Sequence, residues 1–159
     1  MTLPLIRALQ YLVEKKLKKL TIPLNREGII GNSPHLKKCL SLLAQAANSE
    51  GNVLITGETG TGKELFARAI HKNSSRHSKN YVVVDCAGLS DTLAGSILFG
   101  HEKGAFTGAD REQIGLVKQA DGGSLFLDEV GELSASNQKS FLRVLQERRF
   151  RPVGGKQEI

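Results

Sequence analysis

Apolar runs alternate with segments of helical period along this chain, and this predicts a parallel α/β sheet. The runs typical of buried strands occupy residues 53–56, 81–84 and 125–127. Apolar residues recur at helical spacing over residues 34–43, 63–71 and 134–148. In such sheets the ligand-facing edge lies at the carboxyl ends of the strands, so we expect functional residues there.

A separate amphipathic helix is predicted over residues 5–20. Its apolar side chains recur at helical spacing, and its lysines occupy the remaining surface. Pro23 ends this pattern because proline restrains its own backbone and that of the residue before it. We therefore predict a linker helix in residues 1–26 and one domain in residues 27–159, whose first helix has Ser33 as N-cap. The linker helix could instead pack on the domain or pair with a partner helix.

Composition limits the classes of function. The 159 residues, 40% of them hydrophobic, allow one domain with a core, which need not be complete. No apolar run reaches the ~20 residues that span a bilayer, and no signal peptide is recognisable. We therefore expect a cytoplasmic protein without membrane contacts. Cys39 and Cys86 lie in apolar surroundings, so we expect buried, reduced thiols.

The net charge of +6 raises the possibility of nucleic-acid binding. Aromatic residues make up only 5% of the chain, however, and the lysines are spread along it. We expect these charges to be solvated on helix faces or to neutralise a nucleotide.

A glycine-rich loop between the first strand and the helix over residues 63–71 predicts a phosphate-binding site. Glycines allow a tight turn that brings several backbone N–H groups onto one anion, and the helix N-terminus adds partial positive charge. Lys63 supplies a full charge for the outer phosphates, and the carboxylate of Glu64 could hold a hard cation. The alternative is a flexible surface loop. The candidate residues are Gly57, Glu58, Thr59, Gly60, Thr61, Gly62, Lys63 and Glu64.

Carboxylates end the two later strands. Asp85 closes the run over residues 81–84, and Asp128 and Glu129 close the run over residues 125–127. These ends share a sheet edge with the phosphate loop. The first acid of the pair could hold magnesium through water, and the second could orient and deprotonate an attacking water.

Residues 100–109 fit neither a helical nor a strand period. Glycines bracket a lone aromatic residue, Phe106, in this segment. An aromatic ring is costly to leave in water, which favours a loop that contacts a partner over an ordinary surface loop.

Together, the phosphate loop over residues 57–64, the loop over residues 104–109 and the acidic strand end over residues 123–129 closely resemble the AAA+ domain of sigma-54-dependent transcriptional activators, the bacterial enhancer-binding proteins. The resemblance covers residues 29–155. It implies a three-layer P-loop NTPase sheet with helices on both faces, and a ring-forming homo-oligomer that uses ATP and Mg²⁺. Such rings remodel the closed complex of sigma-54 RNA polymerase holoenzyme.

The resemblance also implies roles for individual residues. Lys63 corresponds to the phosphate-binding lysine, Asp128 to the magnesium residue and Glu129 to the catalytic base. Asp85 stands where the family usually has the asparagine of a glutamate switch, and two carboxylates cannot pair without a proton or cation between them. Ile30 and Gly31 resemble the segment near the adenine. The loop that contacts sigma-54 corresponds to Gly104, Ala105, Phe106, Thr107, Gly108 and Ala109.

The sequence also departs from the family. Ile97 stands where a glutamate is usual, and Pro152 where an arginine is usual. We expect the family's sensor strand, arginine fingers, lid domain and DNA-binding helix-turn-helix to lie outside the chain, so that DNA is bound only through a missing C-terminal domain. The sheet should then be incomplete, with unpaired strand edges and apolar faces. Two readings follow: an ATPase part that works once completed, or a truncated module that binds nucleotide or sigma-54 without turnover. An unrelated P-loop protein with a chance loop is a third reading.

Overall fold

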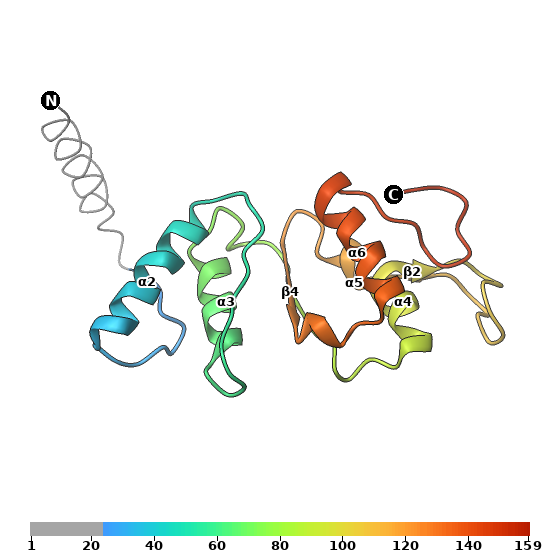
Figure 1. The fold of residues 1–159 in the computed structure, drawn as a ribbon. Coiled ribbons are helices and arrows are strands. Elements are labelled where there is room, and N and C mark those ends of the chain that lie inside the picture. Colours follow the sequence, from blue (N-terminus) through green and yellow to red (C-terminus); the bar gives the residue numbers. More distant parts are fainter. Residues whose placement is uncertain (1–23) are drawn as a thin grey trace, which may run out of the picture.

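The computed structural model describes residues 24–159, so the predicted helix over residues 5–20 lies outside the described residues. Helices α2 (Pro34–Ala47) and α3 (Lys63–Lys72) lie side by side at one end of the molecule (Figure 1). The remaining elements form the other part, and they are β1 (Tyr81–Asp85), α4 (Asp91–Phe99), β2 (Gly100–His101), β3 (Gln113–Ile114), α5 (Leu116–Gln119), β4 (Ser124–Asp128), the 3₁₀-helix η1 (Val130–Glu132) and α6 (Ala135–Glu147). None of these helices is both long and apolar enough to cross a membrane.

Helix α2 begins as the sequence predicts. The Ser33 hydroxyl accepts a hydrogen bond from the Leu36 N–H at 3.2 Å, which satisfies one of the free donors of the first turn. Leu40 and Leu43 are buried from α2 and pack with Ala69 of α3. Cys39 is exposed, so the prediction that both cysteines are buried is wrong for this one. Only one stripe of α2 faces α3, and Cys39 lies outside it.

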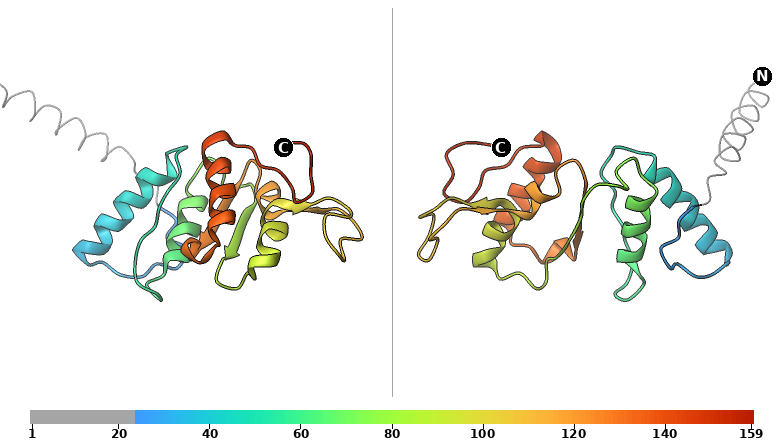
Figure 2. Two further views of the ribbon diagram at one scale, coloured as in Figure 1. Left: turned by 45° about the vertical axis from the view of Figure 1, so that its right-hand side comes forward. Right: turned by 180° about the vertical axis from the view of Figure 1, so that it is seen from behind.

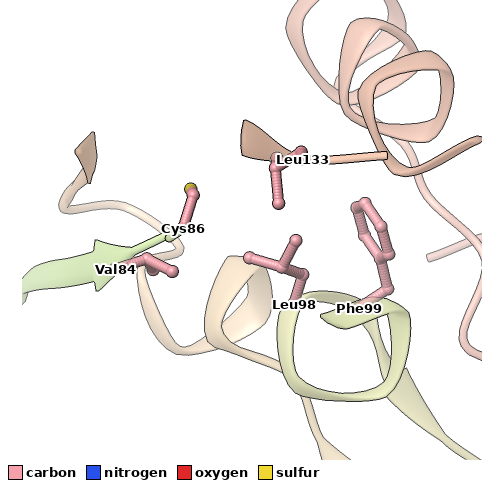
Figure 3. Close-up of a cluster of buried hydrophobic side chains, with 5 residues drawn as sticks. All are labelled: Val84, Cys86, Leu98, Phe99 and Leu133. Carbon is pink, nitrogen blue, oxygen red and sulfur yellow. The ribbon is translucent and has the colours of Figure 1, made fainter. Parts of the chain in front are cut away.

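A two-stranded parallel sheet forms the centre of the second part. Strand β1 pairs with β4 in a register that runs from Tyr81 opposite Ser124 to Asp85 opposite Asp128. This pairing agrees with the predicted parallel α/β class. The core beside the sheet contains five buried side chains, shown in Figure 3: Val84, Cys86, Leu98, Phe99 and Leu133. Phe141 and Val144 of α6 pack against this core, and the predicted burial of Cys86 is confirmed.

The predicted strand over residues 53–56 is not formed. This segment has no regular structure, and the side chains of Val53 and Leu54 are 47% and 80% exposed. Within residues 24–159, β4 pairs with β1 alone, so the segment has no neighbouring strand. A strand without a neighbour would leave its N–H and C=O groups unpaired, so no backbone hydrogen bonds stabilise an extended conformation here. The expectation of an incomplete sheet with exposed apolar side chains is therefore confirmed.

The loop around Phe106 extends from a short hairpin. Strand β2 pairs antiparallel with β3, so that Gly100 lies opposite Ile114 and His101 opposite Gln113. His101 also forms a parallel bridge with Val153. Figure 2 shows from two sides that the loop projects from the end of the molecule opposite α2.

Candidate functional site

The glycine loop turns directly into α3. Gly60 and Gly62 have φ angles of 82° and 85°, a region that side-chain-bearing residues rarely adopt. A Cβ on Gly57 would lie 2.9 Å from the Thr61 hydroxyl, and that hydroxyl donates to the Glu58 carbonyl at 2.7 Å. Helix α3 then begins at Lys63, so its free N–H groups border the loop. The predicted arrangement of loop and helix is therefore present.

Lys63 folds back over this loop. Its ammonium group donates to the carbonyls of Gly57 at 3.2 Å and Glu58 at 3.0 Å. Glu64, the next residue, points away and forms an ion pair with Arg68 at 2.8 Å, in which both side chains are about half exposed. Exposed pairs of this kind contribute about 0.3–0.5 kcal/mol, so the Arg68 contact would be readily given up.

A cavity of about 1120 Å³ lies between the two parts of the molecule. The phosphate loop, the segment over residues 53–56, β4 and α6 line it. Lys63, Asp128 and Glu129 all reach this cavity, which brings together three predicted site residues. Glu64, Asp85, Ile30, Gly31 and the loop over residues 104–109 do not line it.

Matched element lengths place Lys63 and Asp128 at the same end of the cavity. Near the other end, His71 Nδ1 of α3 lies 2.9 Å from the Ser124 hydroxyl at the start of β4. Lys63 lies eight residues before His71, about 12 Å along a helix, and Asp128 lies four residues after Ser124, about 13 Å along a strand. The two elements contact each other and run in opposite directions (Figure 1), so α3 carries the lysine back to the level that β4 reaches at its carboxylate.

A further contact fixes the His71 end. The Arg76 guanidinium donates to the Gly123 carbonyl at 3.2 Å and forms a close ion pair with Glu50. The neighbouring Arg76 lowers the pKa of Glu50. Sequence reasoning missed these partners because residues 71 and 76 are about fifty positions from β4, and no local period links them.

His71 and Tyr81 form a partly polar wall of the cavity. Their ring centroids are 5.1 Å apart. Burial lowers the pKa of His71, with a smaller contribution from the charge of Lys72. Burial also raises the pKa of Tyr81 to about 12. The Tyr81 hydroxyl is buried and has no hydrogen-bond partner among the described residues.

The acidic sheet edge is held by its own backbone. Asp85 accepts a hydrogen bond from the Ala87 N–H and Asp128 from the Glu129 N–H, each at 3.1 Å. Glu129 has φ 50° and ψ 44°, which turns its side chain out of the strand direction. Burial, followed by the charges of Asp85 and Asp128, raises the pKa of Cys86 to about 11, so its thiol stays protonated.

The donor set at this edge suits magnesium. Carboxylate oxygens are the hard ligands that Mg²⁺ takes, one or two at a time, together with waters and phosphates. Asp128 offers such an oxygen to the cavity, whereas Glu64 does not line it. In the described part of the chain, no group of three or more His, Cys, Asp or Glu side chains is placed to hold a metal ion. The predicted metal role of Glu64 would therefore require its side chain to leave Arg68.

The predicted contact loop is well defined at its base. The Gly104 N–H donates to the Ala109 carbonyl at 2.8 Å, and Ala109 is buried. Phe106 is 40% exposed, and its ring centroid lies 4.9 Å from that of His101 in an edge-to-face arrangement. His101 is a residue that sequence reasoning passed over, although it stands in the same glycine-bracketed segment.

Curated relatives match most of the chain but cover little of their own length. Transcriptional regulator VasH of Vibrio cholerae serotype O1 is 50% identical over 131 residues, which is 82% of this chain and 25% of VasH. Transcriptional regulatory protein ZraR of Escherichia coli K12 is 52% identical over 132 residues, 83% of this chain and 30% of ZraR. The Nif-specific regulatory protein of Rhodobacter capsulatus is 50% identical over 137 residues, 86% of this chain and 24% of that protein.

Solved structures show the same fold. The crystal structure of NtrX from Brucella abortus in complex with ATP is 33% identical, with a TM-score of 0.75 over 98% of this chain and 33% of NtrX. The NtrX structure in complex with ADP is 32% identical with the same TM-score. These similarities confirm the predicted fold class. The family described as Sigma-54 interaction domain matches residues 29–159. The chain therefore belongs to the sigma-54 interaction domain family.

Proposed function

We propose that this chain is the nucleotide-binding part of a bacterial sigma-54-dependent transcriptional activator, which binds ATP with Mg²⁺ and contacts sigma-54. One observation carries the proposal: a single cavity receives Lys63 from the phosphate loop and both Asp128 and Glu129 from the strand end. The solved complexes of NtrX with ATP and ADP support it.

The residues of the cavity divide the work of nucleotide binding. The N–H groups of the loop and of the start of α3 would donate hydrogen bonds to the phosphate oxygens, which the partial positive charge of the helix N-terminus also favours. Lys63 would exchange the carbonyls of Gly57 and Glu58 for phosphate oxygens, which bind an ammonium group more strongly because they are charged. Magnesium, when bound through Asp128, would neutralise phosphate charge, and Glu129 would orient a water and accept its proton. Ile30 and Gly31 do not line the cavity, but Ile30 is 93% exposed and would meet the adenine outside it together with Gly31.

Asp85 would act as the sensing residue beside Glu129. Asp85 and Glu129 are both carboxylates, so an interaction between them needs a shared proton or cation. The Asp85 carboxylate already accepts a hydrogen bond from the Ala87 N–H within its own turn. We propose that this departure weakens the coupling between nucleotide state and the contact loop relative to an asparagine.

The loop over residues 104–109 is the proposed contact with sigma-54. It projects from the molecule away from α2 (Figure 2). Phe106 and Thr107 lie within the turn that is closed by the hydrogen bond from the Gly104 N–H to the Ala109 carbonyl. In the whole protein, a cytoplasmic homo-oligomer would use these loops to remodel the closed complex of RNA polymerase holoenzyme, while a separate domain binds DNA.

A second candidate is a module that binds nucleotide or sigma-54 without turnover. The open edge of β4 and the 80% exposure of Leu54 favour it, because an incomplete sheet holds the phosphate loop less firmly against the acids. Steady ATP turnover by the 159-residue chain would contradict this second candidate.

Titration with a fluorescent ATP analogue and Mg²⁺ tests the proposal. Lys63→Ala should weaken binding roughly 10- to 100-fold, since hydrogen bonds to charged groups contribute about 1.5–3 kcal/mol. Lys38→Ala is the matched control, because Lys38 is an exposed lysine on α2, and it should bind as the parent does. Equal affinity for the parent and Lys63→Ala would overturn the assignment of the site.

Capture of purified sigma-54 on the immobilised chain tests the loop separately. Phe106→Ala should reduce the amount captured, while Phe150→Ala, which removes a ring from the core side, should not do so if the protein stays folded. Undiminished capture by Phe106→Ala would overturn the role of the loop.

A further inference from the structure

The tip of the contact loop touches a buried polar pair. His101 is 8% exposed and lies at the base of the loop, at the end of β2. Its Nδ1 atom lies 2.7 Å from the hydroxyl of Ser96, which is 6% exposed on α4. A buried imidazole and hydroxyl that satisfy each other hold a fixed orientation, because breaking the pair would leave two polar groups without partners.

The backbone of His101 is fixed from both sides. It pairs with Gln113 of β3 in the hairpin and with Val153 in a parallel bridge. The flanking hydrogen bonds run from the Glu102 N–H to the Val153 carbonyl at 3.0 Å and from the Val153 N–H to the Gly100 carbonyl at 2.9 Å. The imidazole ring is therefore held by the backbone and by Ser96 together.

The tip turns through two glycines, and backbone hydrogen bonds such as that from the Ala109 N–H to the Phe106 carbonyl at 3.0 Å close it. Gly104 and Gly108 flank it with φ angles of 80° and 94°, and a Cβ at either position would meet no atom within 4 Å. Phe106 lies between these two glycines, and one side of its ring rests on His101 at a centroid distance of 4.9 Å. The ring of His101 therefore supports the ring of Phe106, and we call this ring contact the seat.

We propose that His101, oriented by Ser96, is a positioning residue that seats Phe106 and so holds the loop tip in a closed form. The seated ring is 40% exposed, so a partner that takes up the whole ring must first lift it from His101. The contact with His101 thereby determines how readily Phe106 becomes available to a binding partner. This inference rests on the proposed function only for the identity of the partner, because the seat exists without it.

A single tryptophan can report on the seat. The chain contains no tryptophan, so Phe106→Trp places a unique fluorophore at the tip. In this background, acrylamide quenching should rise at least twofold when His101→Ala removes the seat. Ser96→Ala should raise quenching by a smaller amount, because the ring remains but its orientation is released. His101→Phe should restore part of the protection, since it returns an aromatic ring but not the Ser96 bond that orients it.

His35→Ala is the matched control, because His35 is an exposed histidine on α2, and it should leave quenching unchanged. Far-ultraviolet circular dichroism checks that each variant is folded. If His101→Ala fails to fold, Ser96→Ala provides the test. Equal quenching in the parent and in folded Ser96→Ala would then overturn the proposal. Equal quenching in parent and folded His101→Ala overturns it as well.

Sigma-54 capture then separates the two proposals. With the seat confirmed, folded His101→Ala should capture more sigma-54 than the parent because its tip is already released. If quenching rises in His101→Ala but neither the parent nor the variant captures sigma-54, the proposed sigma-54 contact is contradicted and the seat is still supported. If folded His101→Ala shows raised quenching but captures less sigma-54 than the parent, the proposal that the seat restrains binding is contradicted.

Discussion

Asp85 and Asp128 are register partners at the ends of the parallel strands β1 and β4, so their side chains leave the sheet on the same face. Both carboxylates are turned to neighbouring N–H groups of their own chain segments. Two like charges in adjacent positions repel each other and a phosphate group alike. If the chain binds nucleotide as proposed, we expect the acid at residue 85 to make that binding depend more strongly on a cation than an amide would.

Asp85→Asn should reduce this dependence. In the presence of EDTA, the variant should bind an ATP analogue about two- to threefold more tightly than the parent, a difference of about 0.5 kcal/mol expected for one partly screened charge. With Mg²⁺ present the two affinities should be nearly equal, because the cation already screens the site. Fluorescence titration with and without EDTA measures both. A parent that binds equally well with and without Mg²⁺ would contradict the prediction.

Two leucines should respond very differently to truncation. Leu98 is fully buried at 0% exposure, so Leu98→Ala should lower the free energy of unfolding by about 2–5 kcal/mol through lost contacts and a cavity. Leu54 is 80% exposed, so Leu54→Ser should change it by less than about 0.5 kcal/mol. Urea unfolding monitored by circular dichroism measures both. A large loss for Leu54→Ser would show that residues 53–56 form a buried strand after all.

Stability should fall below neutral pH because of His71. Its folded-state pKa is lowered by burial, so the unfolded chain binds a proton more readily than the folded one. Stability contributed by neutral His71 is present above the unfolded pKa, about 6.5, and is lost as the pH falls from there toward the lower folded pKa. Urea midpoints should therefore decrease from pH 7 to pH 5.

His71→Asn isolates this contribution. Asparagine can still bond the Ser124 hydroxyl but does not titrate, so the variant should lose less stability between pH 7 and pH 5 than the parent. His35→Asn changes an exposed histidine and should keep the parent's pH dependence. An unchanged pH dependence in His71→Asn would exclude His71 as the cause.

Local signals predicted the elements whose causes are local. Ser33 caps α2 through a neighbour three residues away, and the β-branched run of β1 pairs in parallel with β4 as expected. Residues 53–56 carried an equally clear strand signal, but a strand needs a neighbour, and pairing is a property of the whole sheet. The apolar run at residues 53–56 predicted a strand, and this prediction was wrong because the segment has no strand to pair with.

The candidate site divides in the same way. The glycine loop and the acids were recognisable because their chemistry requires fixed spacing within one segment. The seat of Phe106 was not, because a ring contact with His101 and the bridge from His101 to Val153 depend on how the hairpin folds. Two-residue strands such as β2 and β3 are too short to show any period.

The most direct test of nucleotide binding at the phosphate loop is urea unfolding of the 159-residue chain, with and without a non-hydrolysable ATP analogue and Mg²⁺, beside Lys63→Ala. A ligand at a hundredfold excess over its dissociation constant should stabilise the folded parent by about 2.7 kcal/mol. We expect one cooperative transition that shifts to higher urea with nucleotide in the parent and much less in Lys63→Ala. A transition that ignores nucleotide in both proteins would contradict the account.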